Sequence, residues 1–143
     1  MTRKYSSTSI ETTLAATISN SATTITVVAG TGNALMGGVT LAAGNVDQFT
    51  IAIDPDTINE EIVFVTAVST DTLTVVRARA GTTGVTHTAG ATVQHVLTSD
   101  DLNFYTAGVA TANAAIPATI VDAKGDLIAV SYTHLRAHET EAE

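Results

Sequence analysis

The chain has 143 residues, with 14 acidic and 6 basic side chains and a formal net charge of −8. Phosphate binding requires Lys or Arg, and residues 5–76 contain neither, so the composition argues against a nucleic-acid partner. The sequence has no Cys, which excludes disulfides and thiolate chemistry, and it has no apolar run long enough to predict a membrane span or a secretory signal.

Residues 1–11 are polar, and we expect them to form an N-terminal arm. From residue 12 to residue 97, short runs rich in Thr, Val and Ile alternate with turn residues at nearly regular spacing. This pattern predicts a mainly β fold, a small antiparallel β-sandwich or barrel. Period-two alternation predicts the following inward side chains: Leu14, Ile25, Val27, Phe49, Ile51, Phe64, Leu73, Val75 and Val93.

The run from Asp54 to Thr57 predicts a type I turn with Pro55 at its second position. The densest acidic cluster of the chain surrounds this turn and consists of Asp54, Asp56, Glu60 and Glu61. A calcium loop of the helix–loop–helix type would need an oxygen ligand at position 58 and glycine at position 59, but the chain has Ile58 and Asn59 there. We therefore interpret the cluster as a solvated hairpin tip and assign it no metal.

Two further kinds of site are not supported by the residues. His87 and His95 lie on different predicted elements without a Cys or a third His, so we predict no zinc site. The sequence has no Gly-x-Ser-x-Gly motif, and Gly30-Thr31-Gly32 lacks both the further glycine of a dinucleotide loop and the lysine of a phosphate-binding loop. We predict no enzyme activity, no catalytic residue and no cofactor.

A helical linker is expected over residues 98–117. Thr98 and Asp101 have the spacing of a capping box, which predicts a helix within residues 99–114. Leu102, Tyr105 and Val109 follow at near-helical spacing and form a narrow apolar stripe, the predicted oligomer seam. Packing of the same stripe on the chain's own sheet is the alternative.

Residues 118–129 predict a short strand, a turn and the start of a second strand. Because a two-stranded hairpin is marginal alone, we expect this incomplete β-hairpin to begin a truncated region that continues in a longer protein. Residues 130–143 read as a translated sequencing adaptor, since Val130 to Thr140 can be back-translated in register into a transposase end and its adaptor arm. We treat this artefactual tail, with His134 and His138, as foreign to the protein.

Two segments resemble virion proteins of tailed bacteriophages. The first is similar to a small β-domain of minor tail and tail-fibre proteins, and it is carried by Phe49-x-Ile51-x-Ile53, Glu61-x-Val63-x-Val65, Leu73-x-Val75-x-Arg77, Gly81-Thr82 and His87-x-x-Gly90-Ala91-x-Val93. The second, Ile120 to Ile128, resembles the opening of a fibre shaft or head region. Ala78 departs from the family, which usually has glycine after the arginine that ends the strand.

The resemblance implies architectural roles for Arg77, Gly81, His87 and Gly90. Arg77 and His87 would tie the glycine loop to the strand end through hydrogen bonds from side chain to backbone. The resemblance also implies a non-enzymatic structural protein located in the virion, made in the host cytoplasm, which contacts other virion proteins. It would be the attachment domain of a tail fibre or tail-associated protein, trimeric through residues 98 onward.

Two alternatives stay open. One is a capsid decoration or head-fibre protein, which only the location in the particle would distinguish. The other is a bacterial adhesin or carbohydrate-binding β-module, although a sugar platform needs aromatic side chains and the chain has three Phe, three Tyr and no Trp.

Overall fold

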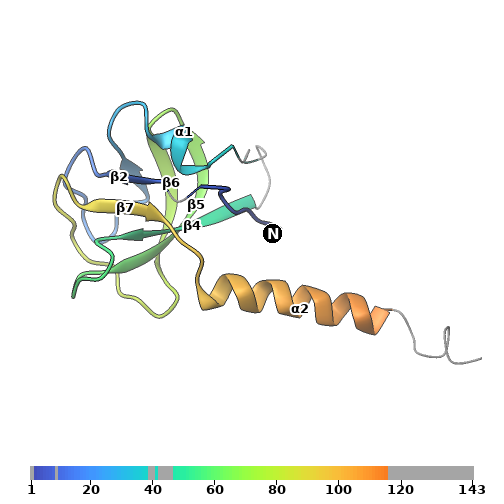
Figure 1. The fold of residues 1–143 in the computed structure, drawn as a ribbon. Helices are drawn as coiled ribbons and strands as arrows, with labels where there is room; N and C mark the ends of the chain where they lie inside the picture. The colour runs from blue at the N-terminus through green and yellow to red at the C-terminus, as the bar shows by residue number, and fades with distance from the viewer. Residues whose placement is uncertain (1, 9, 39–40, 42–46, 116–143) are drawn as a thin grey trace, which may run out of the picture. The chain divides into compact units, whose positions relative to one another are not determined.

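The computed structural model describes residues 2–8, 10–38, 41 and 47–115. The protein is mainly β, a curled antiparallel sheet with two helices, which confirms the predicted fold class (Figure 1). In chain order, the elements are β1 (Thr2–Arg3), β2 (Glu11–Thr13), β3 (Thr24–Thr26), α1 (Gly32–Leu35), β4 (Asp47–Ile53), β5 (Glu61–Ser69), β6 (Thr72–Arg79), β7 (Thr92–His95) and α2 (Ser99–Ala115).

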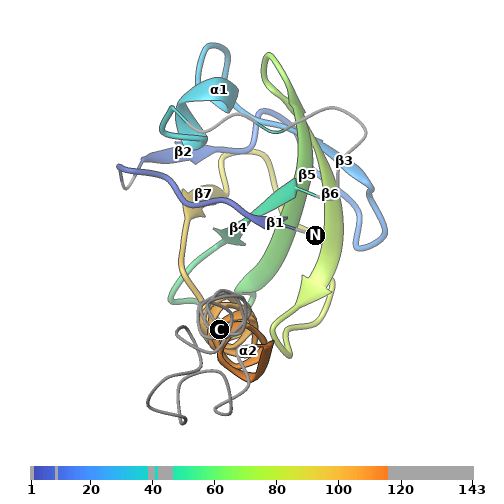
Figure 2. The same ribbon diagram turned by 90° about the vertical axis from the view of Figure 1, so that its right-hand side faces the viewer.

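The strands are hydrogen-bonded in the order β2-β7-β4-β5-β6-β3, and the sheet curls until its two end strands meet (Figure 2). Leu14 and Val27 form an antiparallel bridge just beyond β2 and β3. On either side of this bridge the Ala15 N–H donates to the Thr26 carbonyl at 2.8 Å, and the Val28 N–H donates to the Thr13 carbonyl at 3.0 Å. The curl encloses one core.

The N-terminal segment contributes to the sheet. Thr2 and Arg3 pair in parallel with Asp47 and Gln48 of β4, although antiparallel pairing was expected throughout. The Lys4 N–H extends this pairing by donating to the Gln48 carbonyl at 2.8 Å. Residues 2–4 of the expected arm are therefore bonded to the edge of β4 that β7 leaves open.

Every predicted inward side chain except Phe64 belongs to the main core cluster. The assignment of Phe64 to that core is wrong, because β5 presents Val63 and Val65 to it and Phe64 to the opposite face. Phe64 is nevertheless buried, since the guanidinium carbon of Arg3 lies 4.1 Å from the centre of its ring. Both faces of β5 are covered at this point, so alternation of apolar residues could not fix the phase of the strand.

The loop between β4 and β5 also differs from the prediction. Asp56 has a φ of 60°. A positive φ at the third residue of a four-residue turn belongs to type II and is incompatible with type I. Asp54, the first residue of the same turn, has a φ of 51°.

Helix α2 begins immediately after Thr98, as the capping pattern predicts. The Thr98 N–H donates to Asp101 Oδ2 at 3.0 Å, which is one half of a capping box. The first compact unit of the chain ends at Asn103, beyond the expected boundary at residue 97, and a second unit starts at Phe104. The expected hairpin at 118–129 and the tail at 130–143 lie outside the described residues. Neither α1 nor α2 is long and apolar enough to cross a membrane.

Candidate functional site

A cluster of buried polar side chains is centred on Glu61, the first residue of β5. Glu61 has an exposed fraction of 0% because it alternates in phase with Val63 and Val65, which face the core. The expectation that Glu61 belongs to a solvated hairpin tip is therefore wrong. Its neighbours in the sequence do lie at the surface, with Asp56 exposed and Glu60 half-buried.

Five donors surround the Glu61 carboxylate. Arg77 donates from Nε to Oε1 at 2.7 Å and from Nη2 to Oε2 at 2.5 Å, which makes a bidentate ion pair. The backbone N–H groups of Ala78 and Val85 donate at 2.9 Å and 3.1 Å, and His87 Nε2 lies 3.1 Å from Oε2. We call Glu61, Arg77, His87 and Asp54 the Glu61 cluster.

Arg77 also connects two loops to the sheet. Its Nη1 donates to the Ser19 carbonyl and its Nη2 to the Val85 carbonyl, each at 2.8 Å. These are side-chain-to-backbone bonds of the kind that the resemblance implies for this residue. One guanidinium therefore contacts β5, the β2–β3 connection and the glycine loop that follows β6. Its position constrains these three segments at once.

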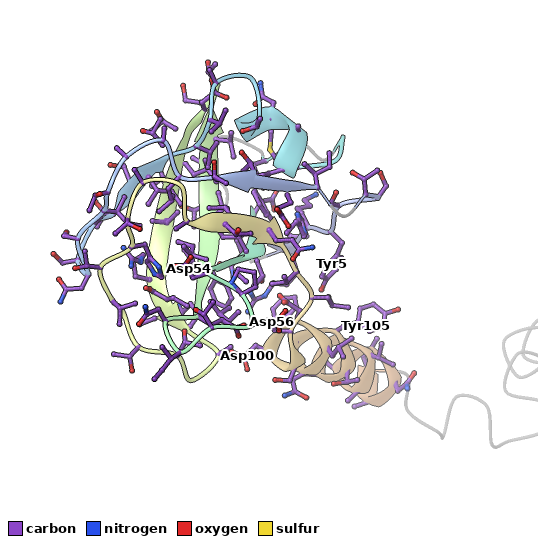
Figure 3. The ribbon with its side chains drawn as sticks, turned by 60° about the vertical axis from the view of Figure 1, so that its left-hand side comes forward. Tyr5, Asp54, Asp56, Asp100 and Tyr105 are labelled. Atoms are coloured by element: carbon purple, nitrogen blue, oxygen red, sulfur yellow. The ribbon has the colours of Figure 1, made fainter. Side chains whose placement is uncertain are left out.

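His87 is fully buried and lies between two carboxylates. Its Nδ1 is 2.8 Å from Asp54 Oδ2, and its Nε2 is 3.1 Å from Glu61 Oε2. The ring thus contacts acidic side chains, whereas the resemblance implies contacts with the backbone. A ring nitrogen that carries a proton can donate to the carboxylate that it faces. Figure 3 shows Asp54 and Asp56 on the loop between β4 and β5, of which only Asp54 reaches His87.

The Glu61 cluster keeps its central carboxylate ionised. Burial raises the pKa of Glu61, but the hydrogen bonds from Arg77, Ala78, Val85 and His87 outweigh this effect and lower the pKa from 4.5 to about 2. The buried negative charge is therefore stable at neutral pH because charged and neutral donors converge on it.

A β-bulge brings the Ala78 N–H to this carboxylate. The β5–β6 register shifts between the Ile62–Arg79 and Phe64–Val76 pairs, which leaves an extra residue on β6. Ala78 takes a φ of 56°, the left-handed conformation that favours glycine. A glycine would adopt this conformation without strain, whereas Ala78 adopts it at a steric cost.

The two predicted structural glycines also have positive φ angles, 80° at Gly81 and 87° at Gly90. Gly81 follows Ala80, whose own φ is 50°, so the chain turns sharply after β6. The Gly90 N–H donates to the Leu14 carbonyl at 2.8 Å, which ties the loop before β7 to the strand that closes the sheet.

A second buried acid, Asp101, fixes the start of α2 on the face that carries Phe64. Its Oδ1 accepts from the Thr50 hydroxyl at 2.9 Å and lies 3.2 Å from Arg3 Nη1. Its Oδ2 accepts from the N–H and the hydroxyl of Thr98 at 3.0 Å and 2.8 Å. The sequence indicated Asp101 only as a helix cap, and its contacts with β1 and β4 carried no sequence signal.

The predicted oligomer seam lies at the surface of α2. Leu102 is 54% exposed, Tyr105 is 66% exposed and Val109 is 43% exposed. The three positions repeat at intervals of three and four residues, the spacing of the apolar positions in a coiled coil.

The Glu61 cluster is built to hold segments together. Both nitrogens of His87 face carboxylates, and the carboxylate of Glu61 is saturated with donors. Over the part of the chain that the structure describes, no group of three or more His, Cys, Asp or Glu side chains could hold a metal ion. Neither a scan against protein-family models nor a search of curated proteins finds a match for this chain.

Proposed function

We propose that this chain is a non-enzymatic structural protein of a tailed-bacteriophage virion, the attachment domain of a tail fibre or tail-associated protein. The motifs of β4 to β7 and the segment 120–128 support this proposal through their resemblance to such proteins. The Glu61 cluster is compatible with a supporting role, since it fixes the loops at one end of the sheet and leaves its polar groups bonded to one another.

The observation that carries the proposal is the oligomer seam. A helix that exposes leucine, tyrosine and valine at coiled-coil spacing gains stability when a partner helix covers them. The C-terminal half of α2 is rich in Ala, a small side chain that allows helices to approach closely. Threefold association through residues 98 onward would bury the seam, with each chain supplying one third of a common core.

Light scattering on the product of the complete gene tests this proposal. We expect a trimer, and we expect a charge in the seam, Leu102→Asp or Val109→Asp, to yield monomers with an intact β-domain. Ala107→Asp is the matched control, because it places the same charge on the opposite side of the helix and should leave the trimer intact. A monomeric wild-type product would overturn the fibre proposal and favour a decoration protein or an adhesin module.

A further inference from the structure

His95 is the last residue of β7. Each of its two ring nitrogens has a hydrogen-bond partner, and together these partners fix the protonation state of the imidazole. Its ring stacks on Phe49 with 4.9 Å between the ring centres and 12° between the planes. Nδ1 lies 2.9 Å from the Leu35 carbonyl, which can only accept, so Nδ1 carries a proton. Nε2 lies 3.3 Å from the Ser6 nitrogen, whose N–H can only donate. The imidazole must therefore present a lone pair at Nε2, and it is neutral.

Ser6 belongs to the N-terminal segment that lies over the end of β7. Residues 5–8 form one wall of a hollow of about 280 Å³, and His95, Val96 and Leu97 form the other. Tyr5, which is 41% exposed, is one of the residues that line this hollow. The bond from the Ser6 N–H to His95 thus joins the two walls directly.

A second proton on His95 would place an N–H group at Nε2, facing the N–H of Ser6. Two donors cannot share a hydrogen bond, and both would be left without an acceptor at this contact. The attachments on either side do not involve the imidazole, since the Lys4 N–H donates to the Gln48 carbonyl at 2.8 Å and the Ser7 hydroxyl donates to the Gly37 carbonyl at 3.0 Å.

We propose that His95 is an acid-sensitive latch whose protonation releases residues 5–8 from the end of β7 and opens the hollow between them. The proposal does not depend on the virion assignment. It rests on the fixed tautomer of His95, on the donor at Ser6 and on the hollow that separates the two walls.

The charges around the latch are consistent with a neutral resting state. Burial lowers the pKa of His95, and this effect exceeds the opposing influence of the Leu35 carbonyl and of the negative charge on Asp101 at the start of α2. Asp101 is itself paired with Arg3 of β1, which offsets its attraction for a proton on His95. Because the folded state disfavours the proton, the latch is closed at neutral pH and opens as the pH falls below the ordinary range for histidine.

Hydrogen exchange of the intact chain, followed by NMR, tests the latch. We expect the protection factor of the Ser6 amide to fall about tenfold as His95 titrates, because one hydrogen bond to the imidazole is lost. The Lys4 amide is the internal control and should keep its protection. A Ser6 protection factor that stays constant through the imidazole titration would overturn the proposal.

The reciprocal measurement follows His95 itself. Ser6→Pro removes the donor and should move the midpoint of the imidazole titration upward, whereas Ser6→Ala keeps the N–H and should leave the midpoint unchanged. In His95→Gln, which cannot titrate, the protection factor of the Ser6 amide should no longer fall over the pH range of the imidazole titration. Equal midpoints in Ser6→Pro and Ser6→Ala would contradict a coupling through the backbone donor, even if one of the variants altered local stability.

Discussion

Glu61 and Arg77 form a bidentate ion pair in the interior of the sheet, with 2.5 Å between Oε2 and Nη2 and with side chains that are 0% and 8% exposed. Such a pair is costly to break, because removing one partner leaves a buried charge without compensation. The same guanidinium donates to the carbonyls of Ser19 and Val85, and the same carboxylate accepts from the Ala78 N–H.

Glu61→Gln should destabilise the protein by about 3–5 kcal/mol, a large part of the stability of a small domain. The amide places a donor where Arg77, Ala78, Val85 and His87 all donate, so at least one of these contacts becomes repulsive. Urea unfolding measures the change. Glu60→Gln is the matched control at the neighbouring half-buried position, and its free energy of unfolding should stay within about 0.5 kcal/mol of the wild-type value. Equal stabilities of the two variants would refute the assigned role of Glu61.

The stability of the protein should fall in acid through the titration of Glu61. Its pKa is lowered from 4.5 to about 2 in the folded state, so its contribution is fully present above pH 4.5 and is lost as the pH falls toward about 2. The contribution amounts to about 3 kcal/mol. Denaturant unfolding at a series of pH values should show this loss in the wild type and a flatter acid limb in Glu61→Gln. Parallel acid limbs would show that another group is responsible.

Ala78→Gly should stabilise the protein by about 0.5–1 kcal/mol. The substitution relieves the left-handed conformation of Ala78, which costs an L-residue about 1–2 kcal/mol, and this gain exceeds the extra entropy that glycine brings to the unfolded chain. Ala67→Gly, at an exposed position of β5, is the control and should destabilise by a similar amount. Thermal melting should therefore move in opposite directions for the two variants, and a decrease for both would contradict the bulge geometry.

Asp101→Asn should cost about 3–5 kcal/mol, well beyond the value of a helix cap alone. The carboxylate is buried against Arg3 and Thr50 and also accepts from Thr98, so the amide weakens an ion pair and a cap together. Asp100→Asn, which changes the same charge one residue earlier, should cost less than about 0.5 kcal/mol. If both variants cost only about 1 kcal/mol in urea unfolding, Asp101 acts as a cap and does not fasten β1 and β4.

The sequence by itself determined the fold class, the inward faces of most strands and the start of α2. In β3 and in residues 72–75 of β6, threonine alternates with apolar residues, so alternation placed Ile25, Leu73 and Val75 in the core. The spacing of Thr98 and Asp101 located the beginning of the helix because capping is a contact between residues near in the chain. The resemblance added Arg77 and His87 as candidate structural residues.

Only the tertiary structure decided the phase of β5 and the partners of its first residue. Phe64 was misplaced because Arg3, distant in the sequence, covers the second face of the strand. Glu61 looked like a solvated acid because an isolated carboxylate prefers water, and its burial is tolerated only where Arg77, His87 and two backbone donors converge on it. Local patterns report which groups prefer water, whereas the long-range contacts of the folded chain determine which polar groups find enough partners to leave it.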